Sequence, residues 1–179
     1  MTDWKGLATM NENNKDDGTE TFDVVVTRVL DALAEEVWKA WSDPAYVTRW
    51  WGPTGFTSPS AEMDFRVGGA SLVCMHAQAE YDGQDMYHTW TYTRIEPRER
   101  IEFVSNFVDE DGTHLDPAAI GVPPGVPYDV SHVVTFEAKG DDRTEMTVTE
   151  YGYTTEQARD LSSAGMEQCF DKMAAIFAG

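Results

Sequence analysis

The feature that most constrains the fold is a two-residue alternation of apolar and polar side chains between Gly55 and Tyr153. Turn residues interrupt it at strand-length intervals, which is typical of consecutive antiparallel strands. The pattern predicts six strands, near 60–66, 70–80, 85–95, 100–108, 129–138 and 143–152. A β-branched run at Phe22–Val29 adds a first strand, which we expect to be buried largely on both faces. The prediction is therefore a seven-stranded antiparallel sheet.

Three helices are expected around this sheet. A helix of about ten residues follows the first strand, and the pair Asp43-Pro44 ends it and begins a second short helix that reaches Trp50. Thr154 and Gln157 form a capping box. Apolar side chains then recur at three- and four-residue steps, which predicts a helix over 155–178, roughly 36 Å long. A curved sheet around one long helix leaves a cavity between them.

Charge and composition exclude several classes of partner. The chain has 32 Asp and Glu against 13 Lys and Arg, a net charge of −19. We therefore expect no nucleic-acid partner, and no membrane insertion because no segment reaches the ~18 apolar residues of a spanning helix. Residues 1–20 read as a flexible acidic and polar tail and 21–179 as a single domain. Without a leader-like segment, we expect a cytoplasmic protein whose Cys74 and Cys169 are buried free thiols.

Five short motifs resemble one known family. They are Val37-Trp38, Trp50-Trp51-Gly52-Pro53, Arg66-Val67-Gly68-Gly69, Arg94-Ile95-Glu96-Pro97 with Arg100-Ile101, and Thr147-Val148-Thr149. Together they resemble the START-like SRPBCC superfamily, in the branch named for the activator of the heat-shock protein 90 ATPase, as its short stand-alone bacterial form. The resemblance covers about residues 22–178. It implies an α+β helix-grip fold, with a cavity for a hydrophobic or aromatic small molecule, and no single activity.

The alternation also predicts which side chains face this cavity, and the resemblance adds residues near its mouth and on the last helix. The expected ligand-binding residues are Trp50, Met75, His88, Trp90, Tyr92, Phe103, Ser105, His132, Val134, Met146, Val148, Glu150, Met166 and Phe170. No catalytic residue is assigned. We expect no cofactor and no metal, because no metal-ligand spacing occurs in the chain.

Three features of the sequence leave alternatives open. His132 and Glu150 are expected on neighbouring strands, where they could serve general-base catalysis, orient a ligand or form a structural pair. His76 and His88 are placed symmetrically about Asp82 and could be near cross-strand neighbours. The Pro-rich segment 109–127 is long for a loop and could act as a lid.

The leading interpretation is a protein that binds a hydrophobic, aromatic or lipid-like small molecule between the sheet and the last helix. One alternative is an enzyme of the cyclase or dehydratase kind in the same cavity, and whether the protein is an enzyme stays open. A second alternative is a co-chaperone-like protein interaction module. Either a monomer or a homodimer is compatible with the sequence, and a protein partner is possible.

Overall fold

The computed structural model describes residues 20–179, so the predicted tail lies outside the described residues except for Glu20. The elements follow in the order β1 (Phe22–Leu30), α2 (Ala34–Ser42), α3 (Pro44–Trp50), β2 (Phe56–Glu62), β3 (Ala70–Ala77), β4 (Asp85–Glu96), β5 (Arg100–Val108), β6 (Val130–Lys139), β7 (Arg143–Tyr153) and α4 (Glu156–Phe177). Short 3-10 turns lie at Ala79–Tyr81 and Pro117–Ile120. The α+β order and the three α-helices agree with the prediction.

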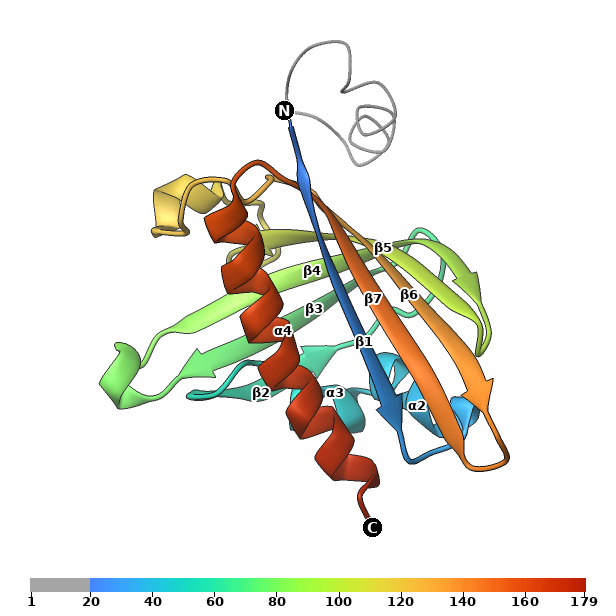
Figure 1. Ribbon diagram of the computed structural model, residues 1–179. Coiled ribbons are helices and arrows are strands. Elements are labelled where there is room, and N and C mark those ends of the chain that lie inside the picture. Colours follow the sequence, from blue (N-terminus) through green and yellow to red (C-terminus); the bar gives the residue numbers. More distant parts are fainter. Residues whose placement is uncertain (1–19) are drawn as a thin grey trace.

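The seven strands form one sheet in the order β1-β7-β6-β5-β4-β3-β2, and each neighbouring pair is antiparallel. The sheet curls, and α4 crosses its concave side while α2 and α3 lie at one end (Figure 1). The predicted helix-grip fold, a curved seven-stranded sheet around a long C-terminal helix, is confirmed.

Two strand predictions need correction. β1 is not buried on both faces: Val24 and Val26 are 1% exposed, whereas Val25 is 61% exposed. The cause is that α4 covers only the concave side, so the convex side of this strand meets solvent. β2 begins at Phe56, four residues before the predicted start at 60, because Phe56 and Thr57 already pair with Ala77 and His76 of β3; the register then shifts between Thr57 and Ser60. That irregularity surrounds Pro59, which an edge strand tolerates.

The helix caps follow the prediction at one helix and differ by one residue at the other. The Asp43 carboxylate accepts a hydrogen bond from Ala45 N at 2.9 Å, which caps α3 as expected. At α4 the capping residue is Thr155 rather than Thr154, and its Oγ1 accepts from Ala158 N at 3.1 Å. The backbone N–H of Thr154 donates instead to Gly125 O at 2.9 Å.

The predicted proximity of His76 and His88 is wrong. The 3-10 turn at Ala79–Tyr81 moves the centre of the β3–β4 hairpin, so that His76 lies opposite Asp85 and His88 opposite Val73. His76 Nδ1 is 2.6 Å from Asp85 Oδ1. Within residues 20–179 no group of three or more His, Cys, Asp or Glu side chains could hold a metal ion.

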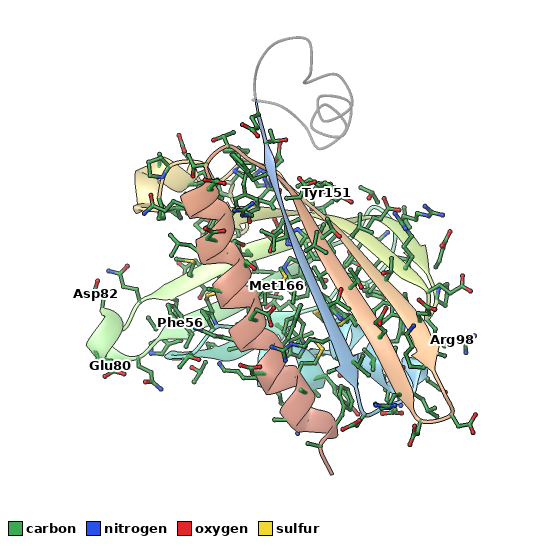
Figure 2. All side chains as sticks on the ribbon, viewed as in Figure 1. Phe56, Glu80, Asp82, Arg98, Tyr151 and Met166 are labelled. Carbon is green, nitrogen blue, oxygen red and sulfur yellow. The ribbon has the colours of Figure 1, made fainter. Side chains whose placement is uncertain are left out.

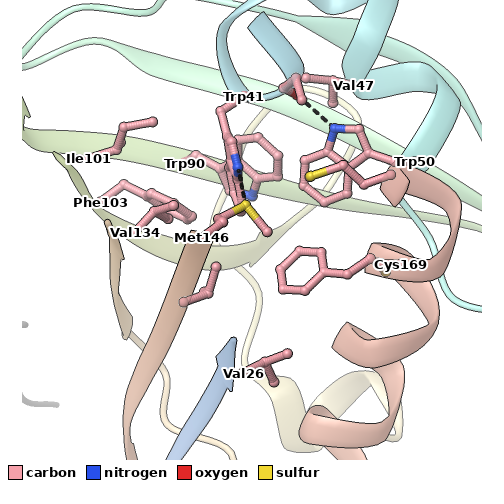
Figure 3. Close-up of a cluster of buried hydrophobic side chains, with 14 of the residues drawn as sticks. Val26, Trp41, Val47, Trp50, Trp90, Ile101, Phe103, Val134, Met146 and Cys169 are labelled. Carbon is pink, nitrogen blue, oxygen red and sulfur yellow. Dashed lines mark hydrogen bonds between the residues drawn. The ribbon is translucent and has the colours of Figure 1, made fainter. Parts of the chain in front are cut away.

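The buried core concentrates where α2 and α3 meet the sheet. Figure 3 shows this cluster, in which the rings of Trp41 and Trp50 lie 4.8 Å apart between centroids. Both indoles have partners: Trp50 Nε1 donates to Ala40 O at 2.6 Å, and Trp41 Nε1 donates to Met146 Sδ at 3.2 Å. Because each indole N–H is hydrogen-bonded, the two rings are buried without the cost of an unpaired donor. They form a stable cluster at the end of the sheet where α2 and α3 lie.

Two further expectations concern the cysteines and the membrane. Cys74 and Cys169 are both buried and free, as predicted. None of the helices in the described part of the chain is long and apolar enough to cross a membrane.

Candidate ligand-binding site

A cavity of about 450 Å³ lies between the concave face of the sheet and α4. Alternate residues of β4, β5, β6 and β7 line it from the sheet, and α4 contributes side chains that include Met166 (Figure 2). The short segment after α3 adds Trp51 and Pro53. Ligand pockets typically occupy about 300–1,000 Å³. The cavity is therefore large enough for a small organic molecule.

Strand register places the predicted inward residues on one face. Trp90 lies opposite Ser105, Phe103 opposite His132, and His132 opposite Glu150. Residues directly opposite each other in antiparallel strands project from the same face. The alternation in the sequence therefore identified the concave face of these four strands correctly, including the His132–Glu150 neighbours.

The structure places ten of the fourteen predicted residues on the cavity wall: Trp50, Met75, His88, Trp90, Phe103, Ser105, His132, Glu150, Met166 and Phe170. The other four, Tyr92, Val134, Met146 and Val148, do not line the cavity. They project from the concave face, but at the end that α2 fills, where each is no more than 2% exposed. Alternation along a strand identifies the face, whereas the position of the covering helix decides which part of that face stays open.

Two important polar residues, Tyr153 and Ser162, were missed by sequence reasoning. Strict alternation from Glu150 would turn Tyr153 to the convex side. The pairing with β1 shifts register between Phe22 and Val24, which marks a β-bulge, and Gly152 there has φ +94°. The bulge turns Tyr153 back to the side of Glu150. A glycine next to the end of a predicted strand was the signal that could have indicated it.

Glu150 is the centre of a buried polar cluster. Its Oε2 accepts a short hydrogen bond from the Tyr153 hydroxyl, and its Oε1 accepts one from Ser162 Oγ at 3.2 Å. The Tyr153 and Ser162 oxygens are themselves 2.9 Å apart. Burial, followed by the nearby Glu150 charge, raises the pKa of Tyr153 well above its ordinary value. Tyr153 therefore acts as a hydrogen-bond donor in this cluster.

His132 lies on the other side of the carboxylate. Its Nε2 is 3.6 Å from Glu150 Oε2, and its Nδ1 is 3.0 Å from Val130 O. A carbonyl oxygen can only accept, so Nδ1 carries the proton of that hydrogen bond and Nε2 is directed toward Glu150. The Phe103 ring stacks on the imidazole at 4.5 Å, with an interplanar angle of 11°. The position of the His132 ring and the donor role of its Nδ1 are thus fixed by its neighbours.

His88 is a second buried imidazole on the cavity wall, and it is 8% exposed. Its ring contacts Trp51 and Phe107, with centroids 5.6 Å and 4.5 Å away. Within residues 20–179, Nδ1 has no hydrogen-bond partner. Burial first, and repulsion from His132 second, lower the pKa of His88 to about 4. His88 is therefore neutral at physiological pH, with an unpaired polar atom in an apolar setting.

The Pro-rich segment 109–127 contacts the cavity through Val122, Pro123 and Val126. It lies beside the first turn of α4 (Figure 1), and Thr155 Oγ1 is 3.2 Å from Pro124 O. The residue that caps α4 thus also holds this segment in place. That the segment opens as a lid stays a prediction.

Lys172 fixes the position of the segment after α3 relative to α4. Its Nζ donates to the backbone carbonyls of Gly52, Pro53 and Phe56 at 2.7, 3.2 and 2.8 Å. Burial is the main cause that lowers its pKa from the ordinary value. The ammonium is occupied by these three carbonyls, so Lys172 supports the cavity wall without entering it.

Comparisons with known proteins agree with this architecture. Among solved structures, a protein from Chromobacterium violaceum is similar with a TM-score of 0.71 and 25% identity, covering 88% of this chain and 97% of that one. A protein from Mycobacterium smegmatis has a TM-score of 0.68 at 22% identity over 92% and 94% of the two chains. An AHSA1 protein from Silicibacter pomeroyi has a TM-score of 0.69 at 19% identity over 88% and 98%.

No curated protein matches the chain significantly. The family evidence comes from residues 31–178, which match the sequence model described as Activator of Hsp90 ATPase homolog 1-like protein. The match spans most of the chain and agrees with the resemblance of the short motifs. The chain therefore belongs to the Activator of Hsp90 ATPase homolog 1-like family, the START-like SRPBCC branch that its short motifs resemble.

Proposed function

We propose that this protein binds a hydrophobic small molecule, aromatic or lipid-like, in the cavity between the sheet and α4. The fold of this family supports ligand binding in general. The observation that carries the finer proposal is the composition of the wall, where aromatic and Met side chains surround one localised polar cluster at Glu150. An apolar wall supplies most of the affinity, and a few polar groups orient the ligand.

The size of the cavity supports a ligand of two or three rings. A cavity of about 150 Å³ holds benzene when its walls are apolar. The space here, about 450 Å³, is three times as large. Trp50, Trp90 and Phe103 offer rigid faces, whereas Met75 and Met166 can change rotamer to follow a ligand's outline.

A thermal-shift screen of aromatic and fatty compounds tests the proposal when it includes a variant with a filled cavity. Gly165 of α4 lines the cavity, and a Cβ there would meet only Pro53 Cβ, at 4.0 Å, so Gly165→Leu places its side chain in the open space. Ala164→Leu is the matched control, because Ala164 is exposed on the same helix. We expect hydrophobic ligands to raise the Tm of wild type and Ala164→Leu but not of Gly165→Leu. Equal responses from all three proteins would contradict the proposal.

A second candidate function is catalysis in the same cavity, of the cyclase or dehydratase kind. The observation that favours it is the buried imidazole–carboxylate neighbourhood, with His132 Nε2 at 3.6 Å from Glu150 Oε2. Mass spectrometry of the compound that co-purifies with wild type and with His132→Gln separates the two functions. An enzyme would leave product in wild type and substrate in the variant, whereas a binding protein would carry the same compound in both.

We also propose that the protein works in the cytoplasm without a nucleic-acid partner. The −19 net charge supports the absence of a nucleic-acid partner, because Lys and Arg residues are what neutralise a phosphate backbone.

A further inference from the structure

We propose that the cavity selects a ligand that bears a positive charge, an aromatic amine in its ammonium form, and that Glu150 receives the ammonium group. The inference rests on the proposed function and names the ligand class for the same site. It follows from the charges on the cavity wall, the direction of its polar atoms and the aromatic faces around them.

The wall of the cavity has negative charge and no fixed positive charge. Among the described residues that line it, Glu150 is the only carboxylate, and no Lys or Arg is present. Lys172 is not among the lining residues, and its ammonium donates to the backbone carbonyls of Gly52, Pro53 and Phe56. A fatty acid or an aromatic carboxylate would lose its hydration without gaining a cationic partner, which is costly at a buried site. The −19 net charge of the chain also opposes the approach of an anion.

The carboxylate of Glu150 is the acceptor at the polar end. Tyr153 and Ser162 donate one hydroxyl each to it. His132 Nε2 lies 3.6 Å from Oε2, while His132 Nδ1 donates to Val130 O. A carboxylate has about four lone-pair sites, more than two hydroxyl donors fill. An ammonium group has several N–H donors and forms charge-assisted hydrogen bonds with a carboxylate.

The surroundings add two further attractions for such a ligand. The Phe103 ring stacks on His132 and also belongs to the cavity wall, so an ammonium at Glu150 lies near an aromatic face. His88 is more than nine-tenths buried, lines the same cavity and has no partner at Nδ1 among the described residues. A neutral imidazole can accept a hydrogen bond from a second donor group on the ligand.

Three probes that differ only in charge test the inference. They are 2-naphthylmethylamine, 2-naphthylmethanol and 2-naphthoate, titrated into the whole chain by calorimetry near pH 8, above the ordinary titration range of imidazole. We expect the amine to bind most tightly, the alcohol roughly tenfold more weakly and the naphthoate most weakly. Equal affinity for the three probes, tighter binding of the naphthoate, or no binding of any probe would overturn the inference. The proposed function is judged separately, by the screen with Gly165→Leu.

A pair of charge-removing variants locates the effect. Glu150→Gln should weaken binding of the amine by roughly ten- to a hundredfold, because the neutral amide cannot replace a charge-assisted bond, and should leave the alcohol within about threefold. Glu167→Gln is the matched control, since Glu167 lies on α4 outside the cavity and pairs with Arg28. An unchanged affinity of Glu150→Gln for the amine would overturn the inference.

NMR of the wild-type protein gives a readout that does not depend on any variant's folding. The inference requires that His132 carry one ring proton, on Nδ1, in the ligand-free protein near pH 8. If the nitrogen shifts show protons on both ring nitrogens, Glu150 already has a cationic partner and the inference is overturned.

Discussion

Acid sensitivity through His88 is the prediction that follows most directly from the geometry of the cavity. The imidazole is 8% exposed, and its pKa falls from 6.5 in the unfolded chain to about 4 in the folded protein. As the pH decreases through this window, the unfolded chain takes up a proton that the folded protein excludes. Stability therefore decreases between about pH 6.5 and pH 4, and the contribution is fully present only above the unfolded value.

The size of the effect follows from the same shift. One pKa unit corresponds to about 1.4 kcal/mol, so the total loss of stability, complete below pH 4, is roughly 3 kcal/mol. Between about pH 8 and pH 5 linkage gives a loss of about 2 kcal/mol from His88 alone. His132 and Glu150 also line the cavity. Both residues are present in wild type and in the variant compared below, so the difference between the two proteins reports on His88.

Urea unfolding of wild type and His88→Leu, each near pH 8 and pH 5, measures this contribution. Leucine preserves most of the side-chain volume and removes the unpaired nitrogen, so the variant should be at least as stable as wild type near pH 8. Its stability should then fall by about 2 kcal/mol less than that of wild type on acidification. Identical pH dependence of the two proteins would refute the account of His88 as a buried neutral imidazole.

Three further substitutions have defined outcomes in urea unfolding. Met146→Ala should cost about 2–5 kcal/mol, because Met146 is fully buried and accepts from Trp41 Nε1; a cost below about 1 kcal/mol would show that this end of the core is loosely packed. Lys172→Met should cost about 2–3 kcal/mol by leaving three carbonyls without their ammonium donor, and wild-type stability would contradict that role. Thr155→Val should cost about 1 kcal/mol through loss of the α4 cap, whereas Thr154→Val, at the position first predicted for the cap, should cost less.

The features that could be predicted from the sequence are those set by local periodicity. Alternation assigned the concave face of β4 to β7, because the register shifts in β4 and β7 lie beyond Tyr92 and Glu150. His132 and Glu150, predicted on neighbouring strands, lie directly opposite each other. The long periodic segment likewise identified α4, within a residue or two of its observed ends.

The features that were missed arise from local irregularities and from tertiary packing. The bulge at Gly152 reverses the direction of Tyr153, and the turn at Ala79–Tyr81 separates His76 from His88. Neither disturbs the average hydrophobic pattern, so periodicity cannot reveal them. The open part of the concave face depends on where α2 packs, which is a property of the assembled fold.

Native mass spectrometry of the protein isolated from its own cells tests the central claim most directly. The account predicts a wild-type population that carries one bound organic molecule of a size that fits about 450 Å³, and its loss in Gly165→Leu but not in Ala164→Leu. It further predicts that the released compound is an aromatic amine. A wild-type spectrum that contains only the bare chain, when the same cell extract and the hydrophobic screen also yield no ligand, would contradict the account.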